Sequence, residues 1–450
     1  MATYVFLDIP GHGHVNPTLA VAHELVRRGE RVIYYLTEEF RPAVEATGAI
    51  FRSYESKMGQ LGSMSGFEPG SMPANPLPFA LIGESEAVLP QVFERIRDDR
   101  PDFILYDTMT FWAKIAARAL HIPAILLRPT FASDGIPGRM MGALAGGNVP
   151  GAPGGGWSAI GTPERGANPP AGAPHGPILG GAARMDVPGM GGMPDFFAGF
   201  RQIDGRLATL CRAYGVEPFT GLEAFFGSEA LNIVFIPREF QPGGEQMDPQ
   251  RFVFVGPSIQ PRLDNTNFPI DQLQGKTVLY ISLGTVMNKQ AAFYNLCFEA
   301  FKDEPWQVVL SIGKQVDPAA LDPTPANFIV RPQVPQLEVL QHAHLFVTHC
   351  GMNSVMESLY YGVPMVGLPQ QGEQMMTARQ IQNLNLGTAL DLTSLTQEQL
   401  HATVKAAMSS PEYRKNALAM QQHVRGAGGY QRAADEILVY ARRQHQAAEE

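Results

Sequence analysis

Short apolar strands alternate with helical patterns along both halves of the sequence, and this alternation constrains the fold more than any other feature. The expected strands are residues 4–9, 31–36, 102–107, 123–127, 233–236 and 252–256 in the first half, and 277–283, 306–312, 344–349 and 363–368 in the second. Apolar strands that alternate with helices form parallel sheets covered on both faces. The sequence therefore predicts an α/β protein with two doubly wound, Rossmann-like domains that face each other across a cleft.

Composition shifts along the chain indicate where these domains begin and end. A polar, proline-containing stretch at 256–275 is typical of an interdomain linker, so we expect domains at 1–245 and 276–425. The remaining residues, 426–450, predict a helix that packs back on the first domain. The segment at about 142–194 contains 16 glycines and nine prolines, which is typical of a mobile loop that can bury little surface.

Charge, cysteine content and hydropathy exclude several classes of protein. The formal net charge is −9, whereas binding to nucleic acid or to an anionic membrane surface calls for a basic face. The three cysteines form no CxxC pair, which favours a reducing, cytoplasmic location. The apolar run at the N-terminus stops at Pro10, which is too short for the apolar part of a secretory signal peptide. No stretch reaches the ~18 apolar residues of a membrane span.

The first candidate for chemistry is the histidine-containing loop after the first strand. We expect a helix from Pro17 to about Arg28, so that His14 lies near its N-terminus, where a neutral imidazole suited to a general base is favoured. Three other interpretations remain open: a dinucleotide loop formed by Gly11, Gly13 and Asn16 with Glu38 as the ribose-binding acid, a metal site with His12, and a plain structural turn.

A second candidate is Asp107, at the carboxyl end of the strand 102–107. This strand and the loop that holds His14 are expected to meet at one sheet edge, where a carboxylate can bind one ring nitrogen and leave the other free as a base. The alternative is that Asp107 caps the helix that follows the strand.

The second half contains a longer constellation between Gln333 and Gln374. The strand 344–348 runs into His349, Gly351 allows close backbone approach, and Asn353 and Ser354 open a helix. A helix N-terminus with such donors is typical of a diphosphate site. Glu357, one turn further on, is placed to bind a ribose diol; alternatively, Ser354 and Glu357 form a capping box. His342, His344 and His349 also raise a metal interpretation, but no acid lies in register with them, so we expect no metal.

With these motifs the chain resembles UDP-sugar-dependent glycosyltransferases of the GT-B fold, especially the bacterial macrolide-glycosyltransferase type. The resemblance rests on GHVNP at 13–17, PDFILYD at 101–107, SLGT at 282–285 and the segment 333–374. It implies an acceptor-binding first domain, a nucleotide-sugar-binding second domain and no cofactor beyond the UDP-sugar. It also implies a hexose, glucose above all, transferred to a small apolar hydroxylated acceptor such as a phenolic, flavonoid or macrolide.

The resemblance assigns a role to each matching residue. His14 corresponds to the catalytic base and Asp107 to its partner acid. The implied contacts are with the diphosphate (Ser282, His349, Asn353, Ser354), the ribose (Glu357), the uracil (Val334, Gln336) and the sugar hydroxyls (Glu373, Gln374). Gly284, Thr285, Gln333 and Gly351 are also implied as donor-binding residues. Two residues depart from the family pattern: Gln333 replaces the usual stacking aromatic, and Glu373 replaces the usual aspartate.

The mechanism implied is an inverting, metal-independent transfer in which His14 deprotonates the acceptor hydroxyl as it attacks the anomeric carbon. Three alternatives use parts of the same sequence. A UDP-sugar epimerase or hydrolase would act without an acceptor, a nicotinamide-dependent dehydrogenase would use the Gly11–Asn16 loop, and a non-catalytic sugar-nucleotide sensor would not need His14 or Asp107.

Overall fold

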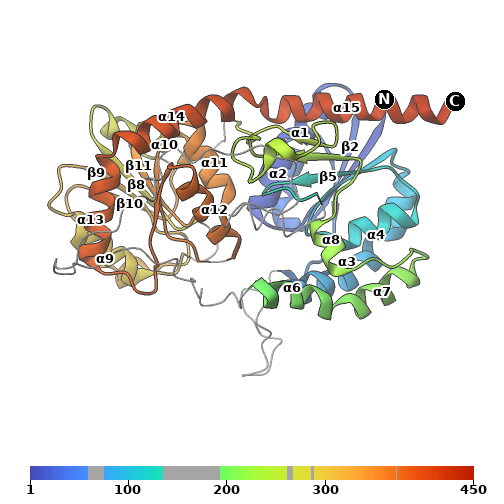
Figure 1. Ribbon diagram of the computed structural model, residues 1–450, viewed down its shortest axis with the longest axis horizontal. Helices are drawn as coiled ribbons and strands as arrows, with labels where there is room; N and C mark the ends of the chain where they lie inside the picture. The colour runs from blue at the N-terminus through green and yellow to red at the C-terminus, as the bar shows by residue number, and fades with distance from the viewer. Residues whose placement is uncertain (59–75, 135–192, 261–266, 285–287, 371, 450) are drawn as a thin grey trace, which may run out of the picture.

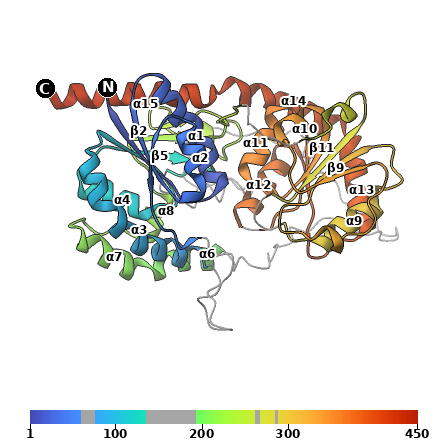
Figure 2. The same ribbon diagram turned by 180° about the vertical axis from the view of Figure 1, so that it is seen from behind.

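A computed structural model of the chain describes residues 1–58, 76–134, 193–260, 267–284, 288–370 and 372–449. Nearly all of the predicted 142–194 loop, Thr285 and part of the predicted linker lie outside these residues. Two α/β domains lie side by side, and the last two helices run along one edge of both (Figures 1 and 2). The predicted fold class, two doubly wound parallel-sheet domains, is confirmed.

The first domain contains a parallel sheet in the order β3-β2-β1-β4-β5-β6-β7. Its strands are β1 (Thr3–Leu7), β2 (Arg31–Leu36), β3 (Ile50–Ser53), β4 (Phe103–Asp107), β5 (Ala124–Arg128), β6 (Leu231–Val234) and β7 (Phe252–Phe254). Its helices are α1 (His12–Arg27), α2 (Arg41–Glu45), α3 (Leu77–Asp99), α4 (Phe111–Ala119), α6 (Met193–Gln202), α7 (Asp204–Ala213) and α8 (Gly221–Phe226). The order reverses between β1 and β4, where ligands bind in doubly wound sheets.

The second domain repeats this plan with the parallel order β10-β9-β8-β11-β12-β13. Its strands are β8 (Val278–Ser282), β9 (Gln307–Ser311), β10 (Phe328–Arg331), β11 (Ala343–Thr348), β12 (Met365–Gly367) and β13 (Gly387–Ala389). Its helices are α9 (Ala291–Phe301), α10 (Gln336–His342), α11 (Met352–Tyr360), α12 (Gly372–Asn383), α13 (Gln397–Met408) and α14 (Pro411–Gly426). Here the order reverses between β8 and β11.

The last helix, α15 (Gly429–Glu449), covers the sheet of the first domain together with α1 (Figure 1). Ala433, Ala434 and Ile437 are fully buried on its inner face. The backbone after β7 packs tightly against the turn before this helix, because a Cβ on Gly256 would lie 2.9 Å from the Cβ of Ala427. The end of the chain thus belongs to the core of its first domain.

Some predicted elements differ from the observed ones. The first helix begins at His12 rather than Pro17, so His14 lies inside its first turn. Strands β3, β10 and β13 were not predicted. A short 3-10 turn at Pro318–Ala320, rather than an α-helix, precedes β10.

Candidate active site

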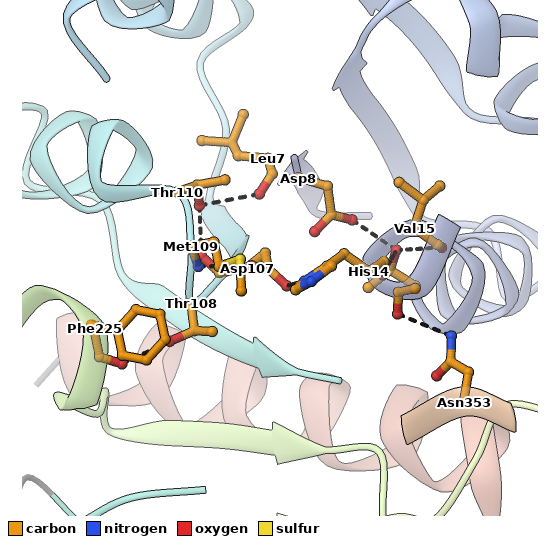
Figure 3. Close-up of polar contacts among 12 residues, drawn as sticks. Leu7, Asp8, His14, Val15, Asp107, Thr108, Met109, Thr110, Phe225 and Asn353 are labelled. Carbon is orange, nitrogen blue, oxygen red and sulfur yellow. Dashed lines mark hydrogen bonds and ion pairs between the residues drawn. The ribbon is translucent and has the colours of Figure 1, made fainter. Parts of the chain in front are cut away.

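His14 and Asp107 form a hydrogen-bonded pair at the point where the order of the first sheet reverses. His14 lies in the first turn of α1, just after β1, and Asp107 is the last residue of the neighbouring strand β4. The distance from His14 Nδ1 to Asp107 Oδ2 is 2.7 Å (Figure 3). The Asp107 side chain is 0% exposed and that of His14 is 15% exposed. The pair is therefore shielded on the carboxylate side and accessible on the imidazole side.

Asp107 also orders the loop that follows its strand. Its other oxygen, Oδ1, accepts the backbone N–H of Met109 at 2.7 Å. Helix α4 begins only at Phe111, with Thr110 as its N-cap and no side-chain capping bond. Asp107 therefore does not cap this helix, as the alternative required; it forms a turn and binds His14.

The charge around His14 favours its protonated form, in contrast to the neutral imidazole expected from its place near a helix N-terminus. Burial lowers the pKa of the imidazole, but the Asp107 carboxylate and its hydrogen bond outweigh burial and raise this pKa to about 9. The carboxylate of Glu373, from α12 of the second domain, acts in the same direction. Since Glu373 influences His14 across the interdomain gap, the two domains contribute to one electrostatic site.

A direct contact joins the domains beside this pair. Pro17 has no N–H, so the carbonyl of Gly13, four residues earlier in α1, loses its usual helical partner. The side-chain amide of Asn353, in the first turn of α11, donates to this carbonyl at 3.0 Å (Figure 3). The proline in the GHVNP motif thus leaves a backbone acceptor that the second domain uses.

The second sheet presents a matching edge at its own reversal point. Ser282 ends β8 opposite Thr348 of β11, so His349 follows directly beside it. A Cβ on Gly284 would lie 2.6 Å from the His349 ring, and a Cβ on Gly351 would lie 2.4 Å from it. Both positions therefore require glycine to accommodate the imidazole. Burial lowers the pKa of His349 to about 4, so this imidazole is neutral at physiological pH.

The remaining predicted donor contacts surround the start of α11. Gly351 is its N-cap, with no side-chain capping bond, so Asn353 and Ser354 lie in the first turn with its free N–H groups. Ser354 is therefore not an N-cap, and the capping-box interpretation of Ser354 and Glu357 is wrong.

Glu357 instead belongs to a polar cluster with Gln336, the first residue of α10. Gln336 Nε2 donates to Glu357 Oε2 at 2.6 Å and lies 3.3 Å from Ser354 Oγ, while the Tyr280 hydroxyl donates to Gln336 Oε1 at 2.9 Å. Tyr280 was not predicted, because a tyrosine inside an apolar strand is indistinguishable from a core residue in the sequence.

The other predicted contacts lie on loops and helix ends facing the same edge. Gln333 is exposed and Val334 half-buried in the loop before α10. Glu373 and Gln374 lie in the first turn of α12, and Gln374 Oε1 accepts the backbone N–H of Gln370 at 2.8 Å.

Among the described residues, the groups of the rival interpretations have other partners or lie apart. His12 is exposed and contacts the edge of Phe40, with ring centroids 5.0 Å apart. Glu38, the ribose-binding acid of the dinucleotide alternative, pairs with Arg41 at 2.8 Å. His344 accepts the backbone N–H of Val278 at the start of β8, whereas His349 lies at the opposite end of these strands. His342, His344 and His349, the three histidines of the metal interpretation, therefore do not lie around one point.

Comparison with known proteins decides the family. Residues 269–425 match the family model described as "UDP-glucoronosyl and UDP-glucosyl transferase". The chain is 34% identical to NDP-glycosyltransferase YjiC of Bacillus subtilis (strain 168) over 441 residues, 97% of each protein. The chain belongs to the UDP-glycosyltransferase family. This glycosyltransferase is also 30% identical to oleandomycin glycosyltransferase of Streptomyces antibioticus, over 97% of its own length and 90% of that protein.

A solved structure gives the same assignment for the fold. CalG4, the calicheamicin glycosyltransferase, superposes on this glycosyltransferase with a TM-score of 0.75 at 28% identity, covering 98% of each chain. The predicted GT-B arrangement is thereby confirmed. Among the described residues, no helix is long and apolar enough to cross a membrane.

Proposed function

We propose that this glycosyltransferase moves a hexose, glucose above all, from a UDP-sugar to a hydroxyl of a small apolar acceptor, with inversion and without a metal ion. The observation that carries the proposal is the 2.7 Å pair of His14 and Asp107, accessible on its imidazole side and under the influence of Glu373 from the opposite domain. Two relatives are named for oleandomycin and calicheamicin. These names support a small natural product, such as a macrolide, as the acceptor; phenolic and flavonoid acceptors are part of the proposal from the family resemblance alone.

In the proposed mechanism, the acceptor oxygen attacks the anomeric carbon as His14 takes its proton, and the bond to UDP breaks. Asp107 orients the ring and stabilises the imidazolium that forms. The transition state has oxocarbenium character, and negative charge gathers on the departing diphosphate. His349, Ser282 and the N-terminus of α11 are placed to donate hydrogen bonds to that charge, the role that a metal ion has elsewhere.

The proposed donor contacts rest on the resemblance to the family, and the polar cluster of Gln336, Ser354 and Glu357 supports them. We assign the ribose to Glu357, the uracil to Val334 and Gln336, and the diphosphate to Ser282, His349, Asn353 and Ser354. Glu373 and Gln374 are assigned to the sugar hydroxyls. The proximity of Glu373 to His14 supports this last assignment, because the sugar must lie between the diphosphate and the base.

A reducing, cytoplasmic location is part of the proposal. Cys211, Cys297 and Cys350 are all buried, unpaired thiols. Burial raises the pKa of Cys350 to about 12, which keeps this sulfur protonated.

The function is tested by a mass-spectrometric screen. UDP-, TDP- and GDP-sugars are each incubated with a mixture of phenolic, flavonoid and macrolide acceptors. We expect a product with the mass of the acceptor plus one hexose minus one water, in greatest yield with UDP-glucose. Release of UDP at the same rate without acceptor would instead indicate a hydrolase.

The pKa of His14 predicts a pH dependence for transfer. A base must be unprotonated, and the raised pKa keeps His14 protonated below about pH 9. We therefore expect kcat/KM for a neutral alcohol acceptor to rise between pH 7 and pH 9. In Asp107→Asn this rise should move to lower pH, because the carboxylate no longer stabilises the imidazolium. An unchanged profile in Asp107→Asn would contradict the pairing.

The exposed Gln333 predicts a gain of affinity on substitution. Since its side chain is exposed beside the proposed uracil site, Gln333→Trp should add a stacking surface without displacing core atoms. The effect of one aromatic stack is ~1 kcal/mol, which corresponds to roughly a five-fold lower Kd for UDP by calorimetry. Gln333→Leu, apolar but without a ring, is the matched control. Equal or weaker binding of UDP by the tryptophan variant would show that the uracil does not lie beside residue 333.

A further inference from the structure

Asp8 is a second buried carboxyl group behind the His14–Asp107 pair. It follows β1 directly, and its side chain is 0% exposed. Its Oδ2 lies 2.8 Å from Thr18 Oγ1, one turn beyond His14 on α1, and also accepts a hydrogen bond from Tyr34 of β2. Figure 3 shows Asp8 between Leu7 and the residues of α1, close to the His14–Asp107 pair.

The oxygen atoms around Asp8 make more contacts than the hydroxyl hydrogens of Thr18 and Tyr34 can fill, which favours an additional proton on Asp8. Thr18 Oγ1 lies close to Asp8 Oδ2, to the Tyr34 hydroxyl at 2.6 Å and to the Val15 carbonyl at 2.8 Å, and Tyr34 also contacts Asp8. These are four oxygen–oxygen contacts, but Thr18 and Tyr34 supply only one hydroxyl hydrogen each. A protonated Asp8 supplies another. Its Oδ1 is buried and has no hydrogen-bond partner among the described residues, which penalises the charged form further.

The electrostatic surroundings of Asp8 favour its protonated form on balance, because the hydrogen bonds from Tyr34 and Thr18, which lower its pKa, are outweighed by burial and by Asp107. Burial, followed by the like charge of Asp107 on the neighbouring strand, raises the pKa of Asp8 to about 7. An ionised Asp8 in turn raises the pKa of His14. The titratable or hydroxyl groups that act on the two residues are Tyr34 of β2, Tyr54 after β3, Asp107 of β4, Thr18 of α1 and Glu373 of α12.

We propose that Asp8 is a positioning residue for sugar transfer, a buried carboxyl that holds a proton with Thr18 and Tyr34 and controls how readily His14 accepts one. The proposal rests on the proposed role of His14 as the base. When Asp8 is protonated, Asp107 and Glu373 are the carboxylates that favour the imidazolium; when Asp8 ionises, a further negative charge favours the protonated ring. Asp8 thus opposes proton release by His14 as the pH rises through neutrality.

The test replaces Asp8 by asparagine, which keeps the shape of the protonated acid but cannot ionise. The proton of His14 is followed by NMR titration of the full-length ligand-free enzyme, and the pH profile of transfer to a neutral alcohol is measured alongside. In Asp8→Asn we expect both midpoints to move to lower pH by roughly 0.5–1 unit, the usual effect of removing one charge several ångströms away. His14→Ala identifies the NMR signal.

Asp99→Asn is the matched control. Asp99 also accepts a tyrosine hydroxyl of β2, that of Tyr35 at 2.6 Å, but it lies at the end of α3 and does not act on His14. We expect no shift of either midpoint in this variant. Tyr34→Phe is a second test that does not depend on the folding of Asp8→Asn: loss of the hydroxyl donor favours protonated Asp8, so the His14 midpoint should again move down.

Thermal unfolding gives a readout that separates this role from simple packing. The pKa of Asp8 is higher in the folded protein than in the unfolded chain. The folded protein therefore loses stability as the pH rises from about 4 to about 7. Asp8→Asn removes that loss, so its Tm at pH 8 should equal or exceed that of the unchanged protein. A purely structural hydrogen bond to an ionised Asp8 would give a lower Tm.

The two readouts distinguish failure of this inference from failure of the proposed function. If the NMR midpoint of His14 is unchanged in Asp8→Asn and Tyr34→Phe, the role of Asp8 is wrong whatever the kinetics show. If the NMR midpoint moves but the pH profile of transfer does not, Asp8 acts on His14 as proposed, and His14 is not the base.

Discussion

His14→Ala should lose most transfer to neutral alcohol acceptors while it binds UDP nearly as tightly as the unchanged enzyme. Removal of a positioned general base typically lowers the rate by ~10²–10⁴-fold. Binding of UDP should persist because its proposed contacts come from the second domain, around Ser282, His349 and α11. The measurements are kcat with a saturating alcohol acceptor and the Kd for UDP by calorimetry.

The control for this prediction is the neighbouring histidine. His12→Ala removes an exposed ring that contacts only the edge of Phe40 among the rings of the described residues, so transfer should stay close to normal. Acceptors that are already ionised, such as a thiol above its own pKa, should suffer much less from His14→Ala, because they need no base. Normal transfer to a neutral alcohol by His14→Ala would place the base elsewhere.

His349→Ala should weaken UDP binding by roughly 10- to 100-fold. The imidazole is neutral, and its acceptor in the proposed complex is the charged diphosphate; such a charge-assisted hydrogen bond contributes ~1.5–3 kcal/mol. The ring also fills the space between Gly284 and Gly351, so alanine leaves a gap there. Calorimetric titration with UDP gives the affinity directly.

Two variants make this result interpretable. His349→Gln keeps a neutral donor and should recover part of the affinity. His342→Ala carries the same substitution at the end of α10, toward the opposite edge of the sheet, and should bind UDP normally. Unchanged affinity in His349→Ala would remove this residue from the diphosphate site.

The central strands could be predicted from the sequence because they are buried on both faces. Residues 278–281 and 308–310 are unbroken apolar runs, and they make up most of β8 and the centre of β9. The missed strands β3, β10 and β13 are all at sheet edges. Edge strands are short and partly exposed, as Ile50 is at 38%, so they lack the continuous apolar run that identifies a central strand.

The proximity of His14 and Asp107 could also be predicted, since both follow strands that a doubly wound sheet places side by side. The buried contacts behind this pair could not be predicted. The sequence contains no sign that Asp8 shares a proton with Thr18 and Tyr34, because these contacts depend on side-chain orientation across α1 and β2. The start of α1 at His12 was not predicted, because Gly11 and Gly13 weaken the helical pattern before Pro17.

The measurement that tests the account most directly is a double-mutant cycle between His14→Ala and Asp107→Asn. Values of kcat/KM for a neutral alcohol acceptor are compared for the two single variants, the double variant and the unchanged enzyme. If Asp107 acts through His14, its substitution should cost little once His14 is gone, so that the double variant resembles His14→Ala. If the two losses instead multiply, the 2.7 Å pair does not act as a unit, and the proposed dyad is wrong.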